Sequence, residues 1–305
     1  MTKILATHSG TFHADDVFAY TVLAAALGGD AGLVRTRDPA VIDAADIVFD
    51  VGGIHDPDRM RFDHHMRGHA PSRPDGTPYS SFGLVWKRFG RDFLSAIDPS
   101  LQGPALEAVW TALDQGVVLQ VDRADNGVEP GVPGDLGSTV EAFNPAWDAA
   151  QDHDAAFMQA HAFAAGVLER AAGVAASRER ARVIVLEAAT HGADPRILEL
   201  PRALPWEEAV LDGGFLDLLF AVFPDDGPDG TWLCKAVPDA KGSLGQRRSL
   251  PDAWRGLRGD DVAAATGVPD AVFCHLAGFI CGAASREGAM ALALAACEPA
   301  HEPRP

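Results

Sequence analysis

The stretch that decides the fold is ILATHSGTFHADDVFAYTVLA, residues 4–24. Its short apolar start predicts a buried strand that ends just before the first histidine, and a glycine-containing loop follows. From Val17 onward the apolar residues predict a helix, which a pair of glycines ends. Two more apolar runs, Leu33–Thr36 and Ile47–Val51, predict further strands. This order with short connections is typical of an α/β protein with a mostly parallel sheet.

The rest of the chain predicts a smaller α+β domain after a helical connection. We expect a first domain at residues 1–148, a connecting helical segment at 149–189 and a second domain at 190–305. Strands are predicted in the second domain at residues 196–200, 216–223, 231–237 and 271–274, and helices at 260–266 and 286–297.

Composition excludes several classes of protein. The 305 residues are 47% hydrophobic, which allows sizeable cores, and carry a formal net charge of −18. This charge argues against a general nucleic-acid coat or a binder of anionic membranes, but not against an enzyme that binds phosphate at a local site.

The cellular location is inferred from three further features of the sequence. The four cysteines form no C-x-x-C pair, and no secretory signal is evident. No apolar stretch approaches the ~20 residues of a membrane helix. We therefore expect a cytoplasmic protein.

Clusters of acids and histidines follow the predicted strands. His8 and Asp50 stand where two of these strands end, and parallel strands bring such residues to one crevice beyond their carboxyl ends. Two further clusters lie farther along the chain. In order, the four clusters are His8-Ser9-Gly10-Thr11-Phe12-His13-Ala14-Asp15-Asp16, Asp50-Val51-Gly52-Gly53, Asp63-His64-His65 and Asp122-Arg123-Ala124-Asp125-Asn126.

These residue types indicate a metal site. Imidazoles and carboxylates cost free energy when they are grouped in a dry cleft, unless a cation lies between them. Carboxylate oxygens with a few imidazoles suit Mn²⁺, Co²⁺ or Mg²⁺, with Zn²⁺ as a further option. Two ions about 3.5–4 Å apart can share a bridging water and stabilise charge on a phosphoryl group. We expect two divalent ions, Mn²⁺ first, with Asp50 or Asp122 as the shared ligand.

The motifs resemble those of a known family. Phosphoesterases of the DHH class are named for the run seen here as Asp63-His64-His65, and the chain resembles the Myg (melanocyte-proliferating-gene) branch of that class. The resemblance covers nearly the whole chain. Besides the four clusters, it includes Gly242-Ser243-Leu244, Leu250-Pro251-x-x-Trp254-Arg255-Gly256-Leu257 and Phe273-x-His275-x-x-Gly278-Phe279-Ile280-x-Gly282.

The resemblance also implies roles for single residues. His65 would contact substrate phosphate and, with Asp50 and Asp122, form the catalytic set. The wider class usually has an aspartate four residues after the first histidine, whereas this chain has His13 one residue further along, which lowers the negative charge of the site. Asp16 is left open between helix capping and orienting a ligand, and the role of Asp125 is left open too. The implied metal ligands are His8, His13, Asp15, Asp50, His64 and Asp122.

The second half carries a local excess of positive charge. Residues 235–258 contain six lysines and arginines but two acids. The simplest interpretation of these basic residues is that they form a solvated surface. The resemblance instead implies a C-terminal domain that closes over the metal cleft and holds the rest of the substrate. We expect this substrate-binding set to be Arg247, Arg255, His275, Gly278 and Gly282.

These observations predict a metal-dependent phosphodiesterase. Members of the resembled family are associated with 3′→5′ exonuclease action, so RNA or a short oligonucleotide is the first expected substrate, gripped locally. The alternatives are a small-molecule phosphatase acting on pyrophosphate or a cyclic dinucleotide, and a metal-bound regulatory module without turnover. No membrane partner is expected, and a homodimer is left open.

Overall fold

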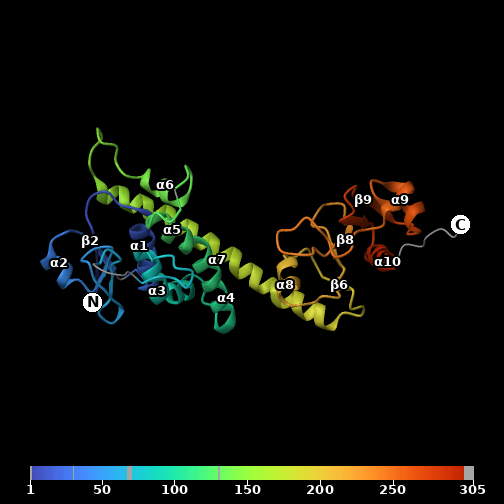
Figure 1. The fold of residues 1–305 in the computed structure, drawn as a ribbon, viewed down its shortest axis with the longest axis horizontal. Helices are drawn as coiled ribbons and strands as arrows, with labels where there is room; N and C mark the ends of the chain where they lie inside the picture. Colours follow the sequence, from blue (N-terminus) through green and yellow to red (C-terminus); the bar gives the residue numbers. More distant parts are fainter. Residues whose placement is uncertain (1, 30, 67–70, 130, 299–305) are drawn as a thin grey trace. The chain divides into compact units, whose positions relative to one another are not determined.

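The computed structural model describes residues 2–29, 31–66, 71–129 and 131–298. It divides into two units, Met1–Ser177 and Arg178–Pro305 (Figure 1). The boundary falls inside the long helix α7 (His153–His191), in the stretch where a connecting helical segment is expected. No helix among the described residues has the length and apolar character needed to cross a membrane.

Unit 1 contains a five-stranded sheet in the order β2-β1-β3-β5-β4. The central strand β1 (Lys3–Thr7) pairs in parallel with β2 (Ala31–Arg35) and β3 (Ile47–Phe49). Two-residue strands complete the sheet: β5 (Arg61–Phe62) is parallel to β3, and β4 (His55–Asp56) is antiparallel. The mostly parallel sheet expected from the sequence is therefore confirmed.

Helices build the rest of unit 1. α1 (Ala14–Ala26) packs chiefly on α3 (Ser81–Ile97), and the pair buries an aromatic core around Phe18, Phe82 and Trp86. The short segment Pro57–Arg59 forms a 3₁₀ turn between β4 and β5. The remaining helices are α2 (Pro39–Ala44), α4 (Gly103–Leu113), α5 (Leu119–Asp125) and α6 (Leu136–Glu141), with a π-helical segment Asp114–Val118 joining α4 to α5.

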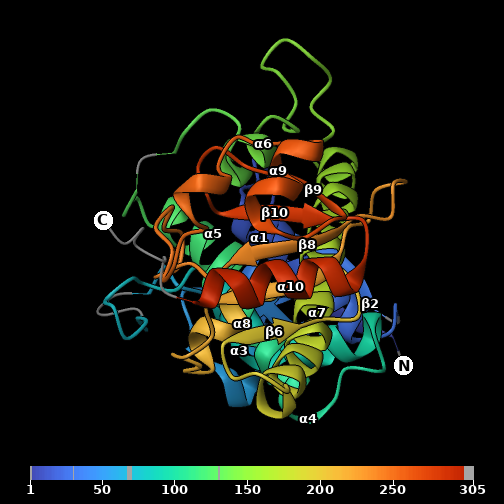
Figure 2. The ribbon, with the colours of Figure 1, turned by 90° about the vertical axis from the view of Figure 1, so that its right-hand side faces the viewer.

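Unit 2 has its own five-stranded sheet and its own core. The order is β6-β7-β8-β10-β9, with β6 and β7 parallel and the other pairs antiparallel. Helix α10 contacts β7, β8 and β10, and Figure 2 shows it running beside β8. The elements are β6 (Ile197–Glu199), α8 (Glu207–Asp212), β7 (Phe220–Pro224), β8 (Trp232–Ala236), a 3₁₀ turn (Asp252–Trp254), α9 (Gly259–Thr266), β9 (Ala271–Cys274), β10 (Ile280–Ala283) and α10 (Arg286–Cys297).

All four cysteines lie in unit 2. Cys281 is directly opposite Cys234 on one side and Cys274 on the other, so three thiols cross the sheet at one level. Cys297 ends α10. All four are free and buried, so they pack as small apolar groups in the core.

Candidate metal centre

The candidate centre starts at the carboxyl ends of β1 and β3. His8 and Asp50 each follow the last residue of these paired parallel strands, and His8 Nε2 lies 3.2 Å from Asp50 Oδ2. Asp50 has a φ of +52°, a left-handed conformation that non-glycine residues seldom adopt and that aspartate tolerates better than most. The sheet therefore imposes the meeting of these two side chains, as the sequence predicts.

Asp16 adds a second carboxylate to His8. Its Oδ2 lies 3.2 Å from His8 Nε2, while its Oδ1 accepts a hydrogen bond of 2.9 Å from the backbone N–H of His13, the residue that caps α1. Both roles left open for Asp16 thus have a contact in the structure: one oxygen caps the helix and the other faces the cluster. His8, Asp16 and Asp50 form a group whose ligand atoms could hold one cation.

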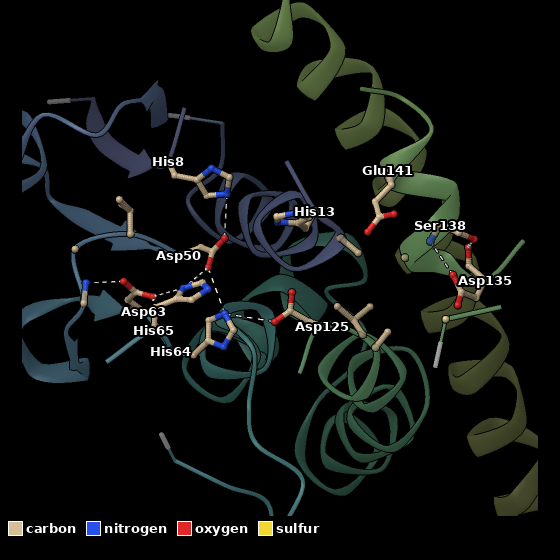
Figure 3. Close-up of a pocket in the computed structure, with 18 of the residues that line it drawn as sticks. His8, His13, Asp50, Asp63, His64, His65, Asp125, Asp135, Ser138 and Glu141 are labelled. Carbon is tan, nitrogen blue, oxygen red and sulfur yellow. Dashed lines mark hydrogen bonds and ion pairs between the residues drawn. The ribbon is translucent and has the colours of Figure 1, made fainter. Parts of the chain in front are cut away.

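His64 gathers the second group of ligands. Its Nε2 lies 3.4 Å from Asp50 Oδ1, 3.6 Å from Asp15 Oδ2 and 3.4 Å from Asp125 Oδ2. Asp15, His64 and Asp125 form a further group able to hold a cation. Because Asp50 directs Oδ2 to His8 and Oδ1 to His64, it stands between the two groups (Figure 3).

His65 belongs to the same cluster but remains accessible. Its Nδ1 lies 3.3 Å from Asp50 Oδ1 and 3.0 Å from Asp63 Oδ1, and its side chain is 64% exposed. Asp63 is buried and also accepts hydrogen bonds from the backbone N–H groups of Gly53 and His65. Asp63 thus fixes the ring of His65, whose Nε2 is left for a ligand.

The electrostatics of the cluster fit a cation. Among the described residues, neither oxygen of the fully buried Asp15 accepts a hydrogen bond. Burial raises the pKa of Asp15 well above its ordinary value, and the charges of Asp50, Asp125 and Asp16 raise it further. Buried carboxylates without donors are costly unless a positive charge compensates them. A divalent cation supplies that charge, so the donor set fits the metal that the sequence predicts.

Contacts with the carboxylates favour the protonated, positively charged form of the histidines. Burial alone would lower the pKa of His8, but its contacts with Asp16 and Asp50 outweigh burial and raise the pKa to about 10. Asp50 raises the pKa of His65 to about 9 against a smaller effect of burial. Burial favours neutral Asp50, yet contacts with His64, His65 and His8 hold its pKa below the ordinary value. Protons thus take the place of cations when no metal is bound.

The structure places Asp122 outside this cluster. Its Oδ1 accepts hydrogen bonds from Ser80 N and Oγ at 3.0 and 2.7 Å, and its Oδ2 accepts one of 2.8 Å from Arg73 Nε. Asp114 holds the other end of the same guanidinium. Asp122 is therefore engaged in a buried ion pair, and Asp125, one helical turn later in α5, is the residue that reaches His64.

A cavity of about 950 Å³ opens over the cluster. His8, His13, Asp50, His64, His65 and Asp125 line it on one side. His13 is exposed, with its ring centroid 6.0 Å from that of His8, and belongs to neither group of ligands described above. Figure 3 shows Asp135, Ser138 and Glu141 on the opposite wall. The cavity is large enough for a nucleotide-sized ligand.

The substrate-binding residues expected in unit 2 do not all lie together. Arg255, His275 and Gly278 lie together: Gly278 N donates to His275 O at 2.9 Å, and a Cβ on Gly278 would collide with the Arg255 guanidinium. Arg247 instead donates to the backbone carbonyls of Phe215 and Leu218. A Cβ on Gly282 would meet the ring of Phe273 and the methyl group of Thr231, so packing explains this glycine.

The sequence interpretation overlooked four residues around the centre. Arg37 lines the cavity, Arg73 and Ser80 hold Asp122, and Ser81 Oγ donates to Asp50 Oδ1 at 3.2 Å. A signal was available for Ser80 and Ser81, because serine before an apolar run predicts the N-terminus of a helix. No spacing rule connects Arg73 with Asp122, which lies 49 residues away.

A mostly parallel sheet with carboxylates and imidazoles beyond its strand ends defines an α/β protein with a candidate divalent-metal centre. Comparison with known proteins then identifies the family. A family profile, MYG1_exonuc, described as "Uncharacterised protein family (UPF0160)", matches residues 4–297. The chain belongs to this family, and the resemblance noted in its motifs is confirmed.

Relatives match over almost the whole chain. The MYG1 protein of Caenorhabditis elegans is 33% identical over 99% of this chain and 97% of its own length. A human protein named MYG1 exonuclease is 34% identical over 95% of this chain and 85% of its own length. Among solved structures, RecJ in complex with Mn²⁺ from Thermus thermophilus aligns at 17% identity over 98% of this chain and 53% of that one. The TM-score of that alignment is 0.28.

Proposed function

We propose that this protein is a divalent-metal-dependent phosphodiesterase that acts as an exonuclease on RNA or short oligonucleotides. The observation that carries the proposal is the shared position of Asp50 between two groups of ligands beneath an open cavity. Paired sites of this kind suit displacement at phosphorus. The name of the human relative, an exonuclease, supports the same class of reaction.

The residues of the cluster would bind the cations as two sets of ligands. His8, Asp16 and Asp50 would hold one cation, and Asp15, His64 and Asp125 the other. Asp50 also groups with His64 and His65, so it could contribute to both sites. The cations would supply an activated water and charge stabilisation at the phosphoryl group. His13 belongs to neither group, and we propose it as an additional ligand from the side of the cavity near His8.

His65 completes this assignment as the group that contacts the substrate. Its Nδ1 is engaged by Asp50 and Asp63, so its Nε2 can donate to a phosphate oxygen in the cavity. Asp122 contributes to stability by holding α5 to Ser80 and Arg73, rather than by touching a cation. In unit 2, Arg255, His275 and Gly278 remain the proposed contacts to the rest of the substrate.

The decisive test is an assay panel on purified protein with Mn²⁺. The panel contains 5′-labelled RNA and DNA oligonucleotides, dinucleotides, pyrophosphate and a cyclic dinucleotide. We expect a ladder of products shortened from the 3′ end, and its loss in an Asp50→Ala/His64→Ala double variant. The matched control is Asp92→Ala/His191→Ala, which changes the same residue types at exposed positions.

Each other result of the panel has a definite meaning. Release of phosphate from pyrophosphate without an oligonucleotide ladder indicates a small-molecule phosphatase. Tight retention of RNA without products indicates a binding module. Full activity in the Asp50→Ala/His64→Ala variant would exclude the centre described above.

A further inference from the structure

Arg37 is the one permanently positive side chain among the described residues that line the cavity. It lies just beyond β2, where Thr36 N donates to Thr7 O at 2.8 Å and so extends the pairing of β1 and β2 by one residue. This pairing brings Arg37 beside His8, and Arg37 Nη2 lies 3.3 Å from His8 Nδ1. The charged lining is otherwise carboxylate and imidazole.

Arg37 differs from the other arginines near the centre in having no carboxylate partner within the described part of the chain. Arg35 pairs with Asp154, and Arg73 pairs with Asp114 and Asp122. Both of these side chains are buried, whereas Arg37 is exposed at the cavity. A guanidinium carries five N–H donors in a fork that matches phosphate geometry. Arg37 thus offers the cavity an unused anion-binding group.

The contact with His8 is compatible with this role. An imidazole that presents Nε2 to a cation carries its proton on Nδ1, where Ser9 O is an acceptor at 3.3 Å. In that tautomer His8 Nδ1 cannot accept a hydrogen bond from Arg37. The N–H donors of Arg37, which lines the cavity, are then available to another acceptor.

We propose that Arg37 binds non-bridging oxygens of the substrate phosphate next to the metal centre. The proposal rests on the proposed function, because it assigns a partner to the phosphate of that same substrate. A cavity lined with so many acids repels a polyanion, and a single guanidinium at its His8 side gives the phosphate one place to enter. Arg37 would therefore govern binding of the phosphate rather than binding of the cations.

The test measures ligand binding directly. Titration calorimetry of adenosine 5′-monophosphate is carried out with Mn²⁺-saturated wild type, Arg37→Ala, Arg37→Lys and the exposed control Arg88→Ala, which lies on α3 away from the cavity. We expect Arg37→Ala to weaken binding of the monophosphate about tenfold or more, with Arg37→Lys intermediate and Arg88→Ala unchanged. Mn²⁺ affinity, measured separately, should stay equal or increase in Arg37→Ala.

The opposite pattern would overturn the proposal. If Arg37 only positions His8, Arg37→Ala weakens Mn²⁺ binding while monophosphate affinity at saturating Mn²⁺ is unchanged. Absence of monophosphate binding in the wild type also contradicts it. Failure of the proposed function is a separate result: the oligonucleotide panel then shows no products even though the arginine still affects monophosphate binding.

Discussion

At the scale of single residues, Asp15 shows most clearly how the ligand cluster destabilises the metal-free protein. It is fully buried at the start of α1, and no described residue donates a hydrogen bond to either oxygen. Its neighbours Asp16, Asp50 and Asp125 repel it. A group in this position destabilises the ion-free protein and gains its partner when a cation binds.

Replacement of Asp15 by asparagine separates these two effects. We expect Asp15→Asn to raise the unfolding free energy of the EDTA-treated protein by about 1 kcal/mol, because it removes a buried carboxyl group that must either stay charged without a partner or take up a proton. The same variant should lose most of the stabilisation that Mn²⁺ gives the wild type. Urea unfolding with and without Mn²⁺ measures both effects, and Asp43→Asn is the exposed control. A wild-type-like response to Mn²⁺ would exclude Asp15 as a ligand.

The pKa values of His8 and His65 predict how stability varies with pH when no metal is bound. Both values, about 10 and about 9, lie above the ordinary 6.5, so the folded state holds protons that the unfolded state releases. Their stabilisation is fully present below about pH 6.5 and is lost as the pH rises through 9 and 10. We expect EDTA-treated protein to be more stable at pH 6 than at pH 9.5 in urea unfolding.

A His8→Gln variant serves as the control for this pH dependence. It should flatten the curve, because the residue with the larger shift can no longer titrate. Mn²⁺ competes with the same protons and should therefore bind more tightly as the pH rises. A pH-independent unfolding free energy in the wild type would contradict the assignment.

At the scale of elements, helix α5 shows why residue types alone did not identify the correct metal ligand. Asp122 and Asp125 are three positions apart, so both lie near one face of the helix. Asp122 turns to Ser80 and Arg73, whereas Asp125 reaches His64. Which of the two aspartates reaches the ligand cluster depends on Arg73, which binds Asp122 from 49 residues away. No local sequence pattern reveals this contact.

Paired substitutions in α5 test this division. Asp122→Asn should lower the unfolding free energy by about 3 kcal/mol, because it breaks a buried ion pair with Arg73, and should leave Mn²⁺ affinity nearly unchanged in the folded fraction. Asp125→Asn should do the reverse, with a small effect on stability and at least tenfold weaker Mn²⁺ binding. Urea unfolding and metal titration distinguish the two, and equal effects on metal affinity would return Asp122 to the ligand set.

Glycines in two helices provide a test of packing. In α3, a Cβ on Gly83 would lie 2.5 Å from Asp122 Oδ1 and 2.8 Å from the ring of Tyr79, while in α7 Gly173 has open space around it. We expect Gly83→Ala to cost about 2 kcal/mol of unfolding free energy through overpacking, and Gly173→Ala to add about 0.5–1 kcal/mol. Thermal and urea unfolding give both values. A neutral Gly83→Ala would mean that α3 and α5 pack less closely than described.

The elements differ in how well the sequence predicted them. The strands at residues 4–6 and 47–51 and the helix at 286–297 follow apolar runs of sufficient length, and the structure contains all three near these bounds. The strands β4 and β5 have two residues each and leave no periodic signal. β10 was not expected, because Gly282 within it is typical of a loop, although close packing against Phe273 requires that glycine.

At the scale of the whole molecule, the hydrophobic clusters of the two units share no described residue. The core of unit 1 ends at Ala176, and the cores of unit 2 begin with Val185 in the same helix α7. The clusters of metal ligands lie within unit 1. The sequence predicted two domains with a helical connection at residues 149–189, and both the last core residue of unit 1 and the first of unit 2 lie in α7.

This separation predicts a selective effect of metal removal. In differential scanning calorimetry we expect EDTA to lower the midpoint of the unit 1 transition, because ligand release destabilises the state that binds the cation. The unit 2 transition should not move. Asp50→Ala should remove the sensitivity to EDTA, and the exposed Asp92→Ala should retain it. A chelator effect shared equally by both transitions would show that the units unfold as one.

The buried cysteines of unit 2 have a practical consequence. Burial raises the pKa of the Cys274 thiol to about 12, and the pKa values of Cys234 and Cys297 are raised too, so these thiols seldom form the thiolate that attacks an alkylating reagent. A maleimide dye should therefore not react with the four native cysteines and should couple only to a cysteine introduced at the surface. One fluorophore on each unit would then report, by energy transfer in single molecules, the distance between them as nucleotide is added.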